Sequence, residues 1–532
     1  MSSRRFYLAV AALQALMATL QVSSIVLESQ TVDEAVHLTA GVAIWKTGDY
    51  RLDREHPPLL PLIAAIPPLI AGVDFKADPA HWESANDFPI AWPFLYQNRL
   101  APDTILLLAR LPAIALTLAL GLVLAVYARR RFGDAPALVA LFFFVTDANL
   151  IAHGRYVTTD AVATFGIFLA AISWIAALDS ERWRDWMLAG AALGIALVAK
   201  FSTLFLLPVH VAVAIAKRRS SLGRPMGAFA AAAAVVAVVY LPDTLRLPSA
   251  PPLASSVQAV SPRAQAMQAA AAKWHVPKHG YLHGVYELLA HDDFGHPTYL
   301  NGVRSAKGSW LYFPTAFAVK TPTATLALSL AAIVLAWRRF SLLAIYPIVY
   351  ALLAVSSSIN LGIRHLLPVY PFLFLLIGIV FARKRWVLAV AVAVQLFELA
   401  RIHPNYLSFF NTLAGGPAAG HRYLLDSNID WGQDGKKLAV WMRQHRVNAM
   451  CVDYFGPAPL PIYGVGMLPL AKNEAERAEL DCQYAVSLTR LFDVYDPPQT
   501  HEWLRKLEPV DRVGYSIWIY DLRKRSGGSI LK

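Results

Sequence analysis

Long apolar segments separated by short polar ones make up most of the chain from residue 6 to residue 401. A helix needs about 20 apolar residues to cross roughly 30 Å of hydrocarbon, and most of these segments approach that length. The pattern predicts eleven membrane-spanning helices, the shortest of them tilted or broken. They lie near 6–27, 104–127, 135–152, 159–178, 186–199, 201–216, 226–241, 313–336, 340–357, 363–381 and 386–401.

Basic residues gather in every second loop between these segments, which predicts the orientation of the helices. Lys and Arg favour the cytoplasmic side, so the N-terminus is expected inside and, with an odd number of spans, the C-terminus outside. The opposite short loops hold only Arg155, Lys200 and Arg364. The basic clusters are Arg4-Arg5, Arg129–Arg131, Arg182 with Arg184, Lys217–Arg219 with Arg224, Arg338-Arg339 and Arg383–Arg385.

Three larger regions are then predicted to face the exterior: the loops 28–103 and 242–312, and the tail 402–532. The tail has ordinary polarity, with an amphipathic helix expected near 433–446 and a second helix near 499–507. Strands are expected near 448–454, 483–489 and 515–522. The fold class that follows is an all-α polytopic membrane domain with a small C-terminal extracytoplasmic α/β domain.

Composition supports the membrane assignment and limits the function. The chain is 56% hydrophobic and only 16% charged, whereas soluble domains carry about 25% charged residues. The net charge of +12 sits in loops that orient helices, so no nucleic-acid partner is expected. Cys451 and Cys482 both fall in the tail and, on the oxidising side, either form a disulfide or remain free thiols.

An acidic pair, Asp33-Glu34, follows the first apolar segment, with His37 one turn further on. Adjacent carboxylates repel each other, which makes one of them a stronger base, and a base or a cation ligand is the chemistry that such a pair suits. The alternative is helix capping, because Thr31 followed by Glu34 has the capping-box spacing. A divalent cation is therefore an open possibility, with Asp33, Glu34 and His37 as its candidate ligands.

Further polar residues occur where the apolar segments meet the predicted exterior. Polar groups at such depth are costly, so those that are present usually have a function. Asp160 is expected to hold Arg155 or to join a supporting network. For the cations the alternative is snorkelling at the interface, and for His56 it is a structural role. The candidate substrate-binding residues are His37, His56, Arg155, Asp160, Lys320, Arg364 and His365, with Lys200 a weaker candidate.

Several of these residues lie in motifs that resemble those of bacterial GT-C glycosyltransferases, close to the protein O-mannosyltransferases and the lipid A aminoarabinose transferase. The resemblance covers most of residues 1–440. It is carried by Asp33-Glu34, by Trp45–Leu52 with Glu55-His56-Pro57-Pro58-Leu59, by Thr158-Thr159-Asp160, by Tyr312-Phe313-Pro314 with Lys320-Thr321-Pro322, and by Asp426–Asp434.

The resemblance implies an inverting transferase that uses a sugar linked to polyprenyl phosphate at the outer face of the bacterial inner membrane. It implies that residues 1–401 form the catalytic membrane domain and that Asp33 is the general base, with Glu34 beside it. The acceptor is left open among lipid, glycan and protein. Two other functions also remain open: a transporter or flippase of lipid-linked saccharides, and a non-catalytic relative that binds glycans.

Overall fold

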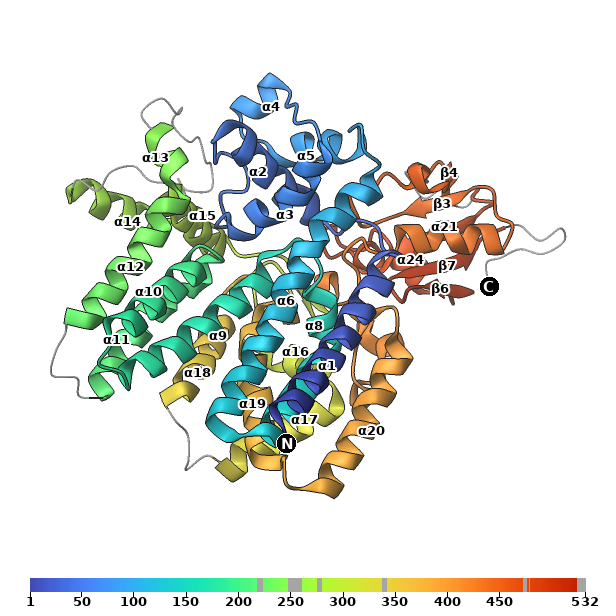
Figure 1. The fold of residues 1–532 in the computed structure, drawn as a ribbon. Helices are drawn as coiled ribbons and strands as arrows, with labels where there is room; N and C mark the ends of the chain where they lie inside the picture. Colours follow the sequence, from blue (N-terminus) through green and yellow to red (C-terminus); the bar gives the residue numbers. More distant parts are fainter. Residues whose placement is uncertain are drawn as a thin grey trace.

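The protein is described by a computed structural model that covers residues 1–217, 223–246, 261–274, 280–336, 342–471, 476–477 and 479–523. The basic cluster Arg338-Arg339 and two members of another, Arg218 and Arg219, lie outside these residues. A bundle of helices occupies most of the molecule, and a sheet region stands at one end of it (Figure 1).

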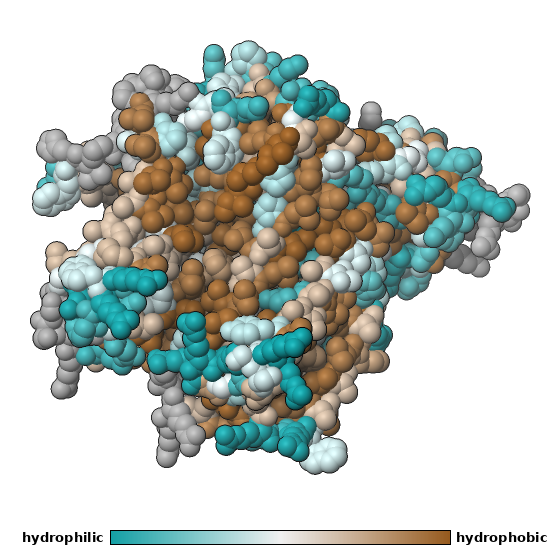
Figure 2. All heavy atoms as spheres, viewed as in Figure 1, coloured by the Kyte–Doolittle hydropathy of each residue, from teal (hydrophilic) through white to brown (hydrophobic). Residues whose placement is uncertain are grey.

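Every predicted apolar segment is helical over most of its length, either as one helix or as consecutive ones. Apolar side chains cover the middle of the visible face of the bundle, and hydrophilic residues gather at its two ends (Figure 2). The bundle comprises α1 (Ser3–Ile25), α6 (Pro102–Phe132), α7 (Asp134–Val145), α8 (Ala148–His153), α9 (Thr159–Leu178), α10 (Trp183–Leu197), η1 (Phe201–Phe205), α11 (Leu206–Ala216), α12 (Gly223–Val239), α16 (Tyr312–Lys320), α17 (Thr323–Ala336), η5 (Leu342–Ala344), α18 (Ile345–Ser356), η6 (Ile363–Val369), α19 (Tyr370–Phe381) and α20 (Arg385–Ile402).

Some of these helices are long and apolar enough to cross a membrane on their own. Among the described residues, four continuous helices meet both criteria: Ser3–Ile25, Pro102–Phe132, Thr159–Leu178 and Ile363–Phe381. The pair α16 and α17 meets them together but is bent by 118°. The bend lies at Thr321-Pro322, where proline lacks the amide proton that a continuous helix needs. Several other helices are apolar but shorter, so the chain is a multi-pass membrane protein and the number eleven stays a prediction.

Small residues bring neighbouring helices of the bundle into close contact. A β-carbon on Gly190 of α10 would overlap the backbone of Ala228 in α12, and one on Gly166 of α9 would press on Ala196 of α10. Close backbone approach through small residues is typical of helix packing in lipid, where water does not drive association.

The predicted external loops carry their own helices above this bundle. The first loop contains α2 (Glu34–Thr47), α3 (Leu59–Ala71), α4 (Pro79–Glu83) and α5 (Asp87–Tyr96). The second contains α13 (Leu241–Arg246), α14 (Pro262–Lys273), α15 (Gly280–Phe294) and the hairpin of β1 (Thr298–Leu300) and β2 (Val303–Ser305).

The C-terminal region forms the predicted α/β structure, with two additional short strands. Its five-stranded sheet has the order β4-β3-β5-β7-β6, with β3 parallel to β4 and β5 and the other pairs antiparallel. Cys451 in β3 and Cys482 before β5 form a disulfide. The elements are α21 (Gly435–Gln444), β3 (Met450–Asp453), β4 (Met467–Leu468), β5 (Gln483–Ser487), α23 (Leu488–Leu491), α24 (Glu502–Arg505), β6 (Asp511–Val513) and β7 (Ile517–Asp521).

The chain between α20 and α21 attaches this region to the rest of the protein. The backbone NH of Ser29 donates to Gln433 O at 2.9 Å, and that of Val32 donates to Trp431 O at 3.1 Å. The Asp426–Asp434 motif therefore lies directly against the residues that precede α2. This contact brings the tail to the acidic end of the first loop.

Candidate functional site

A cavity of about 1020 Å³ lies where the first loop, η1, α15, α18, η6 and the C-terminal region meet. Its wall combines residues that are hundreds of positions apart in the sequence. The ionisable residues in this wall include Asp33, His37, Asp53, Glu55, His56, Lys200, His291, His296, Arg364, His365 and Asp426.

Four alternating charges form a row at the cavity. Arg364 Nη1 lies 3.1 Å from Asp33 Oδ2 and 3.4 Å from Asp160 Oδ2. Lys200 Nζ lies 2.5 Å from the other carboxylate oxygen of Asp160. Asp160 is buried, whereas the Asp33 side chain is 28% exposed. Of the two carboxylates, Asp33 is thus the one that a substrate can reach.

Local structure explains how Asp33 and Arg364 come to face each other. Asp33 is the N-cap residue of α2, but its side chain makes no capping hydrogen bond, which leaves the carboxylate available. Arg364 follows Gly362, whose φ of 127° favours glycine and turns the chain into η6. The Arg364 guanidinium stacks over the Trp431 ring at 4.4 Å, which fixes its direction.

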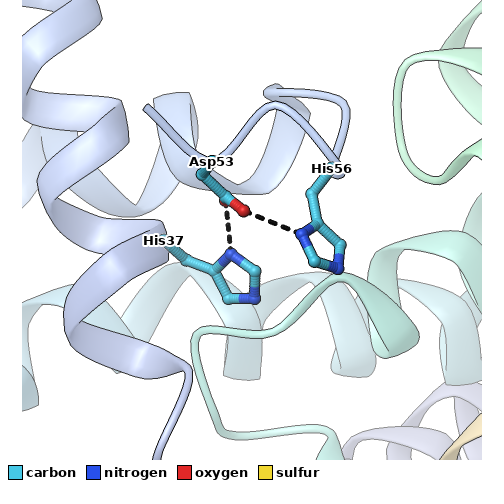
Figure 3. A group of neighbouring side chains, drawn as sticks. All are labelled: His37, Asp53 and His56. Atoms are coloured by element: carbon cyan, nitrogen blue, oxygen red, sulfur yellow. Dashed lines mark hydrogen bonds and ion pairs between the residues drawn. The ribbon is translucent and has the colours of Figure 1, made fainter. Parts of the chain in front are cut away.

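Beside this row, one carboxylate holds two histidines (Figure 3). Asp53 accepts a hydrogen bond from His37 Nδ1 at 2.5 Å on one oxygen and from His56 Nδ1 at 2.7 Å on the other. His37 projects from α2, and His56 lies in the loop after it. The second nitrogen of each ring points away from Asp53 (Figure 3), and both rings line the cavity.

The charges of this cluster are coupled. Although burial alone would raise it, the two histidines hold the pKa of the Asp53 carboxyl well below its usual range. Burial alone would likewise lower the pKa of His37, but the Asp53 carboxylate beside it raises that pKa. His37 therefore keeps its proton at higher pH than an ordinary histidine, and its free Nε2 is a donor toward anions.

His37, Asp53 and His56 are also the donor set that this site offers to a divalent cation, since three of their ligand atoms lie within 4.8 Å of one another. Two imidazoles and one carboxylate are a common ligand combination. Ligand atoms around such an ion lie about 3 Å apart, given metal–ligand bonds of roughly 2.1 Å. The observed contacts are shorter hydrogen bonds, so an ion would have to spread the three groups.

A second polar row runs along the cavity from the first loop to the C-terminal region. His291 Nδ1 bonds Glu55 Oε2 at 2.9 Å, and His291 Nε2 bonds His296 Nδ1 at 3.2 Å. His296 Nε2 bonds the Tyr495 hydroxyl at 3.1 Å, which in turn donates to Asp426 Oδ2 at 2.7 Å. Burial lowers the pKa of His296 to about 4 and raises that of Asp426 to about 6.

Most of the residues singled out from the sequence meet at this cavity. Asp33, His37, His56, Arg364 and His365 line it, together with the weaker candidate Lys200. Asp160 contacts both Arg364 and Lys200, which corresponds to the second of its two predicted roles, a supporting network, and not to holding Arg155. The roles of these residues stay proposals, but the structure places them within one connected group.

Glu34 does not belong to that group, and the expectation of a catalytic carboxylate pair is corrected accordingly. Its side chain is fully buried and forms a two-pronged ion pair with Arg110 at 2.7 and 2.6 Å. It also accepts a hydrogen bond from the Thr31 backbone NH at 3.0 Å, which is the capping alternative. Burial alone would raise the pKa of Glu34, but Arg110 holds it below the usual range.

We expect Glu34→Ala to destabilise the protein by about 3–5 kcal/mol, because it leaves the Arg110 guanidinium buried without its partner. The midpoint of thermal unfolding in detergent measures the effect. The double variant Glu34→Ala/Arg110→Ala should lose less than the sum of the two single variants. Equal stability of Glu34→Ala and the wild type would contradict a structural role.

Arg155 and Lys320 are also structural rather than cavity residues. Arg155 is fully buried and bonds Glu28 at 2.7 Å, and the Tyr156 hydroxyl bonds the same carboxylate at 2.8 Å. Lys320 is fully buried and donates to the backbone oxygens of Leu407 at 2.8 Å and Asn428 at 2.5 Å. Both therefore join distant chain segments, and neither lies open to a substrate.

Sequence reasoning missed Asp53 and the contribution of the C-terminal region. Asp53 precedes His56 by three residues and has a φ of 54°, a conformation that aspartate tolerates better than most residues. Its spacing from His56 was the one signal in the sequence that could have pointed to Asp53, because its other partner, His37, lies on a different element. Nothing in the sequence pattern linked Trp431 or Tyr495 to the first loop.

The comparisons with known proteins concern the fold of the chain. A family model described as dolichyl-phosphate-mannose-protein mannosyltransferase matches residues 100–243, which contain Asp160 and Lys200. The structure of ArnT from Cupriavidus metallidurans bound to undecaprenyl phosphate is similar over 96% of this chain and 97% of that chain, with 14% identity and a TM-score of 0.50.

A second similar structure is the archaeal oligosaccharyltransferase AglB from Archaeoglobus fulgidus in complex with an inhibitory peptide and a dolichol-phosphate. It matches 82% of this chain and 58% of that chain, with 14% identity and a TM-score of 0.47. No curated protein sequence matches the chain. The likeness to ArnT extends over both the helical bundle and the C-terminal region.

Proposed function

We propose that this chain, a membrane protein with the fold of the GT-C glycosyltransferases, transfers a sugar from polyprenyl phosphate to an acceptor and inverts the anomeric centre. The observation that carries the proposal is the row Asp33–Arg364–Asp160–Lys200 at a cavity of about 1020 Å³. A partly exposed carboxylate beside fixed cations is what this reaction requires. The two functions left open by the sequence, transport and glycan binding without catalysis, do not require that arrangement.

The donor follows from the cations around the cavity. Arg364 and Lys200 supply fixed positive charge, and His37 adds a protonated donor that Asp53 maintains. Guanidinium and ammonium groups bind phosphate oxygens through charge-assisted hydrogen bonds. The ArnT structure contains undecaprenyl phosphate, which supports a polyprenyl phosphate as the lipid carrier of this protein too.

Asp33 is proposed as the general base. The acceptor oxygen or nitrogen attacks the anomeric carbon and forms the new glycosidic bond, and its proton passes to the Asp33 carboxylate. The bond from the anomeric carbon to the phosphate oxygen breaks on the opposite side, and polyprenyl phosphate leaves as an anion. Arg364 and Lys200 stabilise that anion, so the leaving group needs no acid.

The reaction is proposed to take place at the outer face of the bacterial inner membrane. Among the described basic clusters, Arg129–Arg131 lies in the last turn of α6, at the end of the bundle opposite to α2 (Figure 1). Positive loops stay cytoplasmic, which supports an extracytoplasmic cavity and C-terminal region.

Donor binding should depend on pH through His37. Because the Asp53 carboxylate raises the pKa of His37, we expect binding of undecaprenyl phosphate to persist above the ordinary histidine range and to weaken as the pH rises further. Asp53→Asn removes that carboxylate, so burial then favours neutral His37 and the alkaline loss should move to lower pH. At a pH between the two alkaline losses the variant should bind roughly tenfold more weakly, since one hydrogen bond to a charged group is lost.

Binding of undecaprenyl phosphate measured across pH for the wild type and Asp53→Asn checks this expectation. Asp49→Asn is the matched control, because Asp49 lies in the same loop but bonds Arg51. Identical pH profiles for wild type and Asp53→Asn would remove the histidine pair from donor binding.

The overall function is tested by the mass of the product. Purified protein is incubated with a panel of polyprenyl-phosphate sugars and membrane extract, and a sugar added to an acceptor supports the proposal. Movement of the intact lipid-linked sugar across vesicles without a transfer product would instead indicate a flippase. Binding of glycans without either activity would indicate a non-catalytic relative. Parallel assays with and without a chelator decide whether a divalent cation takes part.

A further inference from the structure

Two aromatic rings from the C-terminal region form part of the cavity that contains Asp33. Phe455 and Tyr495 stack with a centroid distance of 5.5 Å and an interplanar angle of 15°, and both line the cavity. We call these rings, together with His296 and Asp426, the aromatic wall. None of the four was used in the proposed transfer chemistry.

The aromatic wall is held in position before any ligand arrives. The Tyr495 hydroxyl donates to Asp426 at 2.7 Å and bonds His296 at 3.1 Å. The His296 ring also packs edge-on against Tyr495, with centroids 5.7 Å apart. Tyr495 is nevertheless 37% exposed. A rigid and partly exposed aromatic surface lowers the entropic cost of binding a ligand.

The position of the wall relative to Arg364 suits the acceptor rather than the lipid phosphate. Asp426 lies close enough to Arg364 for the guanidinium charge to act on its carboxyl group. Trp431 of the same segment stacks on that guanidinium. In an inverting displacement the acceptor and the leaving phosphate lie on opposite sides of the anomeric carbon. The aromatic wall lies near Arg364 but contains no Lys or Arg with which to bind the phosphate itself. It is therefore suited to the acceptor, on the other side of the anomeric carbon.

We infer that the aromatic wall is the acceptor subsite and that the acceptor it binds is a saccharide. This inference rests on the proposed transferase function and names its second substrate class. Sugar rings have apolar CH faces that pack on aromatic rings, and hydroxyl groups that bond carboxylates and imidazoles. Burial lowers the pKa of His296 to about 4, so none of the wall's own four side chains is a cation at neutral pH.

Saturation-transfer NMR on the full-length protein in nanodiscs, loaded with undecaprenyl phosphate, tests the inference. The probes are methyl α-mannoside, methyl β-glucoside and methyl β-galactoside, with a serine- and threonine-containing peptide and glucose phosphate for comparison. At least one methyl glycoside should receive magnetisation at its ring CH protons. Tyr495→Ala and Phe455→Ala should each weaken its binding about tenfold, in line with the energy of one aromatic contact.

Three control proteins make the result specific. Trp310→Ala removes an exposed aromatic ring from outside the cavity and should bind as the wild type does. Tyr495→Phe keeps the ring and should lose less than Tyr495→Ala. Asp33→Asn should still bind the glycoside through the wall while losing turnover, so that a failure of catalysis is distinguished from a failure of acceptor binding. If the alanine variants do not fold, Phe455→Leu is used instead. It removes the aromatic ring but keeps an apolar side chain, and it should also weaken glycoside binding.

Other outcomes would overturn the inference. Preferential binding of the peptide or of glucose phosphate would assign a different acceptor class, and unchanged glycoside binding in both ring variants would remove the wall. Loss of glycoside binding when the Asp33→Asn protein is preloaded with polyprenyl-phosphate mannose would instead assign the wall to the donor sugar.

Discussion

Asp33→Asn should lower the rate of sugar transfer by roughly 10²- to 10⁴-fold, the contribution of a positioned general base. The amide has the size of the carboxylate but cannot accept the proton of the attacking group. Because the Asp33 side chain makes no capping hydrogen bond, the substitution should leave α2 folded. Turnover with a polyprenyl-phosphate sugar measures the loss, and binding of undecaprenyl phosphate should be retained.

Asp87→Asn is the matched control for this variant. Asp87 lines the same cavity, and burial raises its pKa to about 7, but it bonds the backbone of Asp53 rather than Arg364. It should retain nearly all of the wild-type rate. Transfer by Asp33→Asn at the wild-type rate would rule out Asp33 as the base and leave the cavity without an assigned one.

Arg364→Gln should weaken the binding of undecaprenyl phosphate by at least about 30-fold, because removing one partner of a buried charge pair costs roughly 2–5 kcal/mol. Arg364 contacts Asp33 and Asp160 and stacks on Trp431, so its loss removes one of the two fixed cations of the donor site. It also leaves Asp160 with Lys200 alone. Titration of the purified variant with undecaprenyl phosphate measures the change.

Arg364→Lys separates charge from shape. Lysine keeps the positive charge but lacks the planar guanidinium that bridges two carboxylates and stacks on an indole. The affinity of Arg364→Lys for undecaprenyl phosphate should therefore lie between those of the wild type and Arg364→Gln. Arg155→Lys is a useful comparison, since that guanidinium is buried on Glu28 away from the cavity. It should change stability more than donor affinity. Unaltered lipid binding by Arg364→Gln would contradict the assignment of Arg364 to the phosphate.

The helical bundle was largely predictable because a membrane span is a local property. A run of apolar residues must form a helix in lipid, where every backbone group needs an internal partner. The segments 104–127, 159–178 and 363–381 accordingly fall within α6, α9 and the η6–α19 helix. The predicted strands of the tail also correspond to β3, β5 and β7, since alternating and β-branched patterns are local too.

The site was predictable only in part, for a different reason. Asp33, Arg364 and His365 were identified because charged residues at the end of an apolar run are rare enough to be informative. The same criterion selected Arg155 and Lys320, which are buried structural residues. A buried cation and a substrate-binding cation look alike in the sequence, and only their partners distinguish them. Those partners, Glu28 for Arg155 and Asn428 for Lys320, are 127 and 108 positions away.

The sequence by itself determined that this protein crosses a membrane several times, carries a C-terminal α/β region and presents an acidic residue beside the first span. Tertiary structure alone decided that Glu34 pairs with Arg110 while Asp33 faces Arg364. It also joined His37 to Asp53 and brought Trp431 and Tyr495 into the cavity. Periodicity records which side of an element is apolar, whereas contacts between distant segments depend on packing that no local pattern encodes.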